Sequence, residues 1–239
     1  MVITVTLDAA LEKTLRVPGL RLGVDCRAER AEMRPGGRAL RTAMAVRELG
    51  GRVAAVGVAG GAEGEYIRDQ LDQMGLPNDL TAGRARTPVE LRLMDGERVT
   101  RIRETPAKAS ERELREVWRK VSDLAGPGDV AVFAGELPAS LTPEMLGGWI
   151  DRLRRDGVLT VLDVEEGRKY AAAAPDVLIE EEDNQVLFSS ADETLRRERP
   201  EEDGDEMVTA HFALELAVSE DWRKAADVST KSAERKKSF

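Results

Sequence analysis

Residues 129–164, DVAVFAGELPASLTPEMLGGWIDRLRRDGVLTVLDV, decide the fold class. Asp129–Ala134 and Val158–Val164 are short apolar runs rich in valine, which is typical of buried strands. Between them, Thr142–Arg155 has the apolar spacing of a helix, with Pro143 in its first turn. A strand, a helix and a second strand in this order predict a right-handed βαβ unit within a parallel sheet.

The same alternation extends outward in both directions along the chain. Further strands are expected at Val2–Leu7, Arg52–Ala59 and Val177–Ile179, and further helices at Arg38–Leu49, Glu65–Met74 and Ser110–Leu124. The last helix opens with Ser-Glu-Arg-Glu, the pattern of a capping box. The pattern predicts an α/β body built around a mainly parallel sheet.

One part of the chain does not follow this alternation. Val89–Met94 and Arg98–Arg103 flank Asp95-Gly96, a dipeptide typical of β-hairpins. Together with an extended segment at Val24–Met33, this hairpin predicts a small second sheet that projects from the body. Because so few strands are not stable alone, we expect two copies to pair through this sheet as a homodimer.

Composition excludes several classes of protein and of site. The 36 basic and 45 acidic residues give a net charge of −9, which disfavours binding to nucleic acid. No apolar run approaches the roughly 18 residues of a membrane span, and the first residues do not resemble a signal peptide, so we expect no membrane partner and a cytoplasmic location. Cys26 and His211 are each the only residue of their kind, which excludes an internal disulfide and disfavours a structural zinc site.

Five short motifs resemble those of PfkB-type sugar kinases and occur in the same order. They are TLDAALEKT at 6–14 (family TLNPALDKT), PGGRA at 35–39 (PGGKG), GVAGGAEG at 57–64 (GxxGGxxG), AGELP at 134–138 (SGSLP) and VLD at 161–163 (ILD). The resemblance covers about residues 1–180 and is strongest to the branch of 1-phosphofructokinase and tagatose-6-phosphate kinase. It implies a ribokinase-like fold, a three-layer α/β/α body with a small β-sheet lid that often contributes to dimerisation.

The family transfers the γ-phosphate of ATP, with magnesium, to a hydroxyl of a sugar phosphate. On the sugar side, the resemblance implies ligand-binding roles for six residues: Glu12, Gly36, Gly37, Arg38, Arg41 and Gly135. Gly36 and Gly37 have an alternative role in a tight turn that packs a helix onto the sheet. At Thr87-Pro88 the family has a threonine–arginine pair that binds phosphate, so one positive charge is absent here.

The catalytic motif of the family, GAGD, is altered in this chain. Glu202-Asp203-Gly204-Asp205 stands in its place, so that Asp205 matches the catalytic base and Gly204 the anion hole. The alternative role for Asp205 is an N-terminal cap of the helix that follows. Glu202 and Asp203 place negative charge where a phosphate should bind, and two like charges 4 Å apart repel by about 4 kcal/mol at an effective dielectric near 20.

The segment that should bind the nucleotide is also altered. Glu180–Asp183 is acidic where the family has a lysine, and it is either a divalent-ion site or the solvated N-terminus of a helix. Only about 20 residues, Asn184–Asp203, follow it, whereas a strand–helix–strand unit needs about 30. We therefore expect the adenine and ribose site to be missing.

Three functional hypotheses follow from the sequence. The first is a degenerate relative without ordinary phosphotransfer that serves as a phosphosugar-binding or scaffold dimer, for which the sequence identifies no certain cofactor. The second is an active hexose-phosphate kinase that uses magnesium-ATP, and the third is a protein that retains only the fold. For the domains, we expect residues 1–217 to form the body, with the lid at about 14–35 and 87–104, and residues 218–239 to form a terminal helix and a charged tail.

Overall fold

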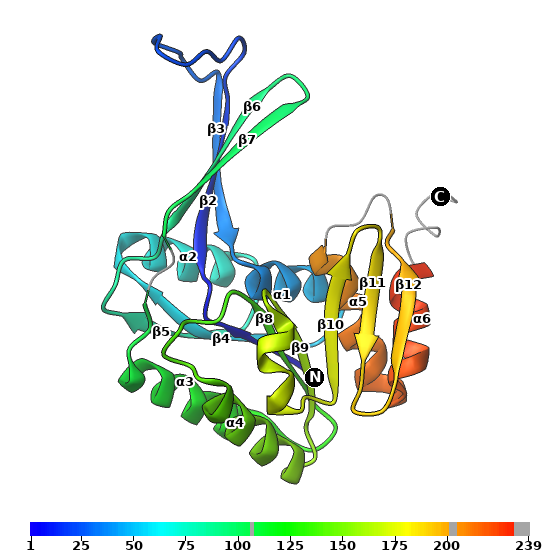
Figure 1. Cartoon of the computed structure of the whole chain (residues 1–239). Helices are drawn as coiled ribbons and strands as arrows, with labels where there is room; N and C mark the ends of the chain where they lie inside the picture. The colour runs from blue at the N-terminus through cyan, green and yellow to red at the C-terminus, as the bar shows by residue number, and fades with distance from the viewer. Residues whose placement is uncertain (106–107, 201–204, 232–239) are drawn as a thin grey trace.

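The body of the protein is built on an eight-stranded sheet, seen in a computed structural model that describes residues 1–105, 108–200 and 205–231 (Figure 1). In spatial order the strands are β12 (Thr194–Glu198), β11 (Gln185–Ser189), β10 (Val177–Glu182), β9 (Leu159–Val164), β8 (Val130–Gly135), β1 (Val2–Thr6), β4 (Val53–Gly60) and β5 (Asn78–Gly83). The strands from β10 to β5 are parallel, and β11 and β12 join antiparallel at one end. The predicted α/β class is therefore confirmed.

Helices cover both faces of this sheet and make it the middle of three layers. The helices are α1 (Arg38–Glu48), α2 (Gly61–Gln73), α3 (Glu111–Leu124), α4 (Pro143–Arg155), α5 (Asp205–Ser219) and α6 (Trp222–Lys231), with a 3-10 turn, η1, at Gly167–Ala173. Val2 of β1 packs in the core with α1, α5 and α6, whereas Ile3 packs in the core with α3 and α4. Since side chains alternate along a strand, both faces of β1 are buried, as expected for a parallel sheet.

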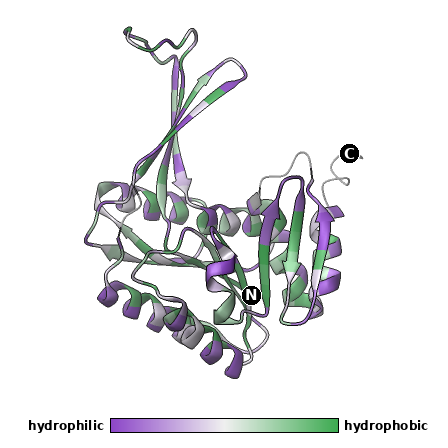
Figure 2. Ribbon diagram, viewed as in Figure 1, coloured by the Kyte–Doolittle hydropathy of each residue, from purple (hydrophilic) through white to green (hydrophobic). Residues whose placement is uncertain are grey.

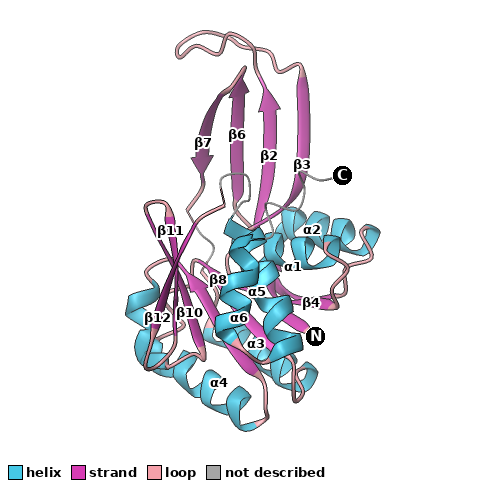
Figure 3. Ribbon diagram, turned by 90° about the vertical axis from the view of Figure 1, so that its right-hand side faces the viewer, coloured by secondary structure: helices cyan, strands magenta, loops and turns pink. Residues whose placement is uncertain are grey.

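The second sheet projects from the body as predicted (Figure 3). We call it the lid; its strands, in spatial order, are β3 (Arg30–Gly36), β2 (Ala10–Arg16), β6 (Val89–Asp95) and β7 (Arg98–Arg103). The predicted hairpin is present, because Asp95 pairs with Arg98 and Gly96 takes a left-handed φ of 60° in the turn. Polar and apolar residues are interleaved along the lid, whereas the strands of the body are mainly apolar (Figure 2).

One strand prediction was inaccurate, and two strands were missed. The extended segment expected at Val24–Met33 is paired only from Arg30 and runs on through Pro35 to Gly36. Ala10–Arg16 and Asn78–Gly83 are strands that the sequence pattern did not indicate. Each of them pairs with a strand distant in sequence, so tertiary contacts override weak local propensity there.

The acidic run at Glu180–Asp183 is not the start of a helix, which corrects that alternative. Glu180–Glu182 continue β10, and Asp183, with a φ of 52°, begins the turn into β11. The described residues between β10 and α5 contain no strand–helix–strand unit, in agreement with the shortness of this stretch, but β11 and β12 form an unpredicted hairpin there.

The C-terminal part contains the two helices that the sequence predicted. Ala225 and Ala226 of α6 are fully buried in the same core as α5. Gly204, the predicted anion-hole residue, and residues 232–239, the end of the terminal helix and charged tail expected at 218–239, lie outside the described residues. No helix in the described part of the chain is both long enough and apolar enough to cross a membrane.

Candidate sugar-phosphate site

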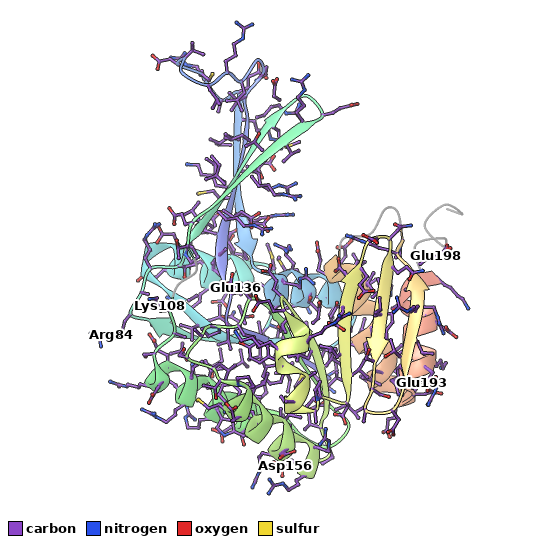
Figure 4. All side chains as sticks on the ribbon, viewed as in Figure 1. Arg84, Lys108, Glu136, Asp156, Glu193 and Glu198 are labelled. Atoms are coloured by element: carbon purple, nitrogen blue, oxygen red, sulfur yellow. The ribbon has the colours of Figure 1, made fainter. Side chains whose placement is uncertain are left out.

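A cavity of about 440 Å³ lies between the lid and the body. It opens at the carboxyl ends of β1, β4 and β8, and the lid strands β2, β6 and β7 form its other wall. The chain leaves β1 toward β4 and later returns to β8 on the other side, so this is a topological switch point of the sheet, where α/β proteins bind their ligands. Glu136, at the end of β8, lies where the lid meets the body (Figure 4).

Most of the residues chosen from the sequence gather around this cavity. Those that line it are Glu12, Gly37, Arg38, Arg41 and Gly135. Asp205 is the first residue of α5, and the adjacent Glu206 lines the cavity, so the start of this helix faces the same space. Gly36 is not part of the lining; a Cβ at this position would lie 2.5 Å from Glu12 Cγ, so the glycine leaves room for the Glu12 side chain.

Glu12 is held by two arginines. Arg34 Nε donates to Glu12 Oε2 and Arg41 Nη1 donates to Glu12 Oε1, each at 2.7 Å. The Glu12 side chain is only 3% exposed, and burial alone would raise its pKa, but the two arginines outweigh burial and lower the pKa. Both carboxylate oxygens are therefore already engaged.

Asp8 is a site residue that sequence reasoning missed. Its Oδ2 accepts the backbone N–H of Arg38 at 2.8 Å, while Oδ1 is buried and has no hydrogen-bond partner among the described residues. Burial raises the pKa of Asp8 to about 6, against the opposing effects of that hydrogen bond and of the charges of Arg41 and Arg38. The signal in the sequence was the aspartate at the third position of TLDAALEKT, where the family motif has asparagine.

The Arg38 side chain is committed to a neighbouring region. Its Nη1 donates to Asp163 Oδ1 at 2.7 Å and lies 3.4 Å from Glu181 Oε1, while Asp163 Oδ2 accepts from the Thr209 hydroxyl at 2.7 Å. These groups border a second cavity of about 290 Å³ at the ends of β9 and β10. Five carboxyl groups line it, from Asp163, Glu165, Glu166, Glu180 and Glu181, against the two guanidinium groups of Arg38 and Arg168.

The acidic run contributes ion pairs instead of a metal site. Arg168 approaches Glu180 and Glu182, and Arg196 also pairs with Glu182 at 3.2 Å. Among the residues that the structure describes, no three His, Cys, Asp or Glu side chains converge as a metal-binding group.

The lid contributes two arginines that face each other. Arg92 of β6 and Arg101 of β7 are direct cross-strand partners, and both line the larger cavity. Arg92 Nε is buried without a hydrogen-bond partner in the described part of the chain. Because like charges at opposed positions destabilise a sheet, an anion bound between them would relieve the repulsion. The sequence showed the arginines of the hairpin but not their register or their side of the sheet.

Comparisons with known proteins match this chain over most of its length. A family model described as pfkB family carbohydrate kinase matches residues 5–210. Tagatose-6-phosphate kinase of Staphylococcus epidermidis is 25% identical over 193 residues, covering 81% of this chain and 61% of that protein. 1-Phosphofructokinase of Vibrio cholerae is 28% identical over 177 residues, covering 69% of this chain and 56% of that protein. The chain thus spans less than two thirds of the length of either relative.

Solved structures show the same fold. Phosphofructokinase-2 from Escherichia coli in complex with fructose-6-phosphate superposes with a TM-score of 0.81 at 18% identity, covering 97% of this chain and 92% of that one. A tetrameric inhibited form of the same enzyme gives the same TM-score and the same coverage. This likeness confirms the predicted three-layer body with its projecting lid.

Proposed function

Since the chain belongs to the pfkB family of carbohydrate kinases, we propose that it binds a sugar phosphate beneath the lid and does not carry out ordinary ATP-dependent phosphotransfer. The family resemblance inferred from the five motifs is thereby confirmed, and the ligand class and the loss of activity are the proposal.

The opposed pair Arg92 and Arg101 is the observation that carries the proposal. A phosphate dianion accepts several charge-assisted hydrogen bonds, and guanidinium groups match its geometry. At Thr87-Pro88, where the family has a phosphate-binding arginine, this chain has none. The pair on the lid supplies positive charge to the same cavity, and Glu12 does not pair with it because both of its oxygens accept from Arg34 and Arg41.

The described residues on the nucleotide side do not fit magnesium-ATP. The second cavity is lined mostly by carboxyl groups, and Arg38 is held there by Asp163. A triphosphate would meet net negative charge in this region, with no convergent metal-binding group among the described side chains to offset it. The hairpin of β11 and β12 lies where a longer nucleotide-binding segment is expected from the family.

Calorimetry with fructose 6-phosphate and, separately, magnesium-ATP tests the proposal. We expect heat of binding with fructose 6-phosphate and none with magnesium-ATP. The double variant Arg92→Gln/Arg101→Gln should weaken sugar-phosphate binding at least tenfold, since each charged hydrogen bond contributes about 1.5–3 kcal/mol. The matched control is Arg98→Gln, which removes an exposed lid arginine that does not line the cavity. Equal affinities in the two variants would refute the role of the opposed pair.

An active hexose-phosphate kinase is the second candidate, favoured by the position of Asp205. This residue begins α5, and its neighbour Glu206 lines the sugar-phosphate cavity. Steady ADP production from fructose 6-phosphate and magnesium-ATP that is abolished by Asp205→Asn would establish this candidate and overturn the loss of phosphotransfer.

The lid also presents an apolar face, defined by Leu15, Met33, Leu91, Leu93 and Ile102. The strand registers place these residues on the side opposite Arg92 and Arg101, where Lys13 also lies, and none of the five lines the cavity. Met33 is 44% exposed and Ile102 is 51% exposed. We propose that the lids of two copies pack together through this face, so that sedimentation at micromolar concentration should show a dimer. A monomer would contradict this part of the proposal.

A further inference from the structure

Asp8 and Glu12 are two of the carboxyl groups that line the sugar-phosphate cavity, and their surroundings differ. We propose that Asp8, and not Glu12, is the carboxylate that accepts a hydrogen bond from a hydroxyl of the bound ligand. This inference rests on the function proposed above and names the residue that distinguishes a hydroxyl-bearing phosphate ester from a simple phosphate.

Glu12 is poorly suited to bind a ligand hydroxyl. Each of its oxygens accepts a hydrogen bond of 2.7 Å from an arginine, and its side chain is 3% exposed. A ligand hydroxyl would have to displace Arg34 or Arg41 and leave a guanidinium group without its partner. Glu12 instead fixes the positions of these two arginines on the cavity wall.

Asp8, unlike Glu12, has a carboxylate oxygen that is available to a ligand. Its Oδ1 is buried beside the cavity and has no hydrogen-bond partner among the described residues. A buried carboxylate oxygen without a partner is costly, so a donor supplied by a ligand would offset that cost. The same burial raises the pKa of Asp8 to about 6.

Two glycines keep the space around Asp8 clear. Gly135 and Gly37 have left-handed φ values of 89° and 95°. A Cβ at Gly135 would lie 1.9 Å from Asp8 Oδ2, and one at Gly37 would lie 3.1 Å from Asp8 Oδ1. Both glycines also line the cavity, so the backbone approaches the Asp8 carboxyl from two sides without covering it with side chains.

A purely structural role for Asp8 makes a different prediction. Asp8 Oδ2 accepts the N–H of Arg38 at the start of α1, and an asparagine at position 8 retains an oxygen for this bond. Asp8→Asn therefore preserves the contact with the helix and removes the charge. If Asp8 only supports α1, ligand affinity should not respond to this change.

The test is calorimetry at pH 8, where Asp8 is ionised, with fructose 6-phosphate and inorganic phosphate as separate probes. Asp8→Asn should weaken binding of fructose 6-phosphate by about tenfold or more and should not weaken binding of inorganic phosphate, because only the sugar has alcohol hydroxyls and the loss of a negative charge does not disfavour an anion. The matched control is Asp176→Asn. Asp176 accepts hydrogen bonds from Thr160 and lines neither cavity, so both affinities should stay at the wild-type value.

The outcomes separate this inference from the proposed function. Fructose 6-phosphate binding within twofold of wild type in Asp8→Asn overturns the role of Asp8 alone. Wild-type protein that binds neither probe overturns the proposed function and this inference together. As a second measurement, the carboxyl carbon resonance of Asp8, identified by its absence in Asp8→Asn, should move when fructose 6-phosphate is added to the wild type; no movement at saturation counts against the inference.

Discussion

The buried carboxyl of Asp8 is expected to cost the unliganded protein stability at neutral pH. Burial raises its pKa from the ordinary value of 3.8 to about 6, and a difference of one in pKa corresponds to about 1.4 kcal/mol. Asp8→Asn should therefore raise the free energy of unfolding at pH 8 by about 3 kcal/mol. A variant that is more stable but binds its ligand less well is typical of a site residue.

Proton linkage determines how the stability of the wild type changes with pH. Between about pH 4 and pH 6 the folded state holds a proton on Asp8 that the unfolded state has released, so wild-type stability falls as pH rises through this window. Above pH 6 the cost is constant, and below pH 4 it is absent. The neighbouring Arg38 and Arg41 stay charged throughout, so the difference between wild type and Asp8→Asn isolates Asp8.

Urea denaturation of both proteins at pH 4, 5, 6 and 8 measures this difference directly. Asp163→Asn is the control of opposite sign, because it weakens the 2.7 Å contacts of a buried carboxylate with Arg38 and Thr209 and should lower stability by about 2 kcal/mol. Asp8→Asn that is no more stable than wild type at pH 8, or a difference that does not change with pH, would refute the reasoning.

Three further predictions concern the site, a helix and the lid. Glu12→Gln should lower the free energy of unfolding by about 2–4 kcal/mol at pH 7, since it leaves Arg34 and Arg41 without their carboxylate. Because the pKa of Glu12 is lowered in the folded state, the difference in stability between wild type and variant should shrink as the pH falls below 4.5. A difference in urea unfolding that does not change with pH would contradict this. Ser110→Ala removes the cap of α3 and should cost about 1 kcal/mol in thermal or urea unfolding, with no loss of sugar-phosphate binding. Ile102→Glu places a charge on the apolar face of the lid and should convert the proposed dimer to a monomer in sedimentation, and a persistent dimer would place the interface elsewhere.

The body could be predicted because its determinants are local. The helix at 110–124 shows this well, since both halves of its predicted capping box are present: Ser110 Oγ accepts from Glu113 N at 3.3 Å, and Glu113 Oε2 accepts from Ser110 N at 2.7 Å. The strand–helix–strand unit at 129–164 also formed as expected, with Thr142 as the N-cap before Pro143.

The strands that the sequence did not predict depend on contacts between distant parts of the chain. Ala10–Arg16 has the composition of a helix, yet it lies between β3 and β6 and takes its hydrogen bonds from both. Glu180–Glu182 form a strand because Arg168 and Arg196 neutralise part of the charge and β11 provides the backbone partners. These arginines are distant in sequence, so a local reading of four acidic residues had no access to them.

Only part of the candidate site could be predicted, because some of its features depend on contacts between distant segments. The motifs located Glu12, Gly37 and Gly135 at the cavity because each motif occupies a fixed place in the family fold. The significance of Asp8 comes from burial, and that of the pair Arg92 and Arg101 comes from strand register. Neither property is visible in a single sequence.

The hairpin of β11 and β12 has a consequence for association between molecules. A sheet that stopped at β10 would expose the backbone of Val177–Ile179, an apolar strand open to pairing with another chain. The outermost strand is instead β12, five residues long, with Arg196, Arg197 and Glu198 in its sequence. Short, charged border strands discourage edge-to-edge aggregation, so the hairpin protects this edge of the sheet from pairing with another chain.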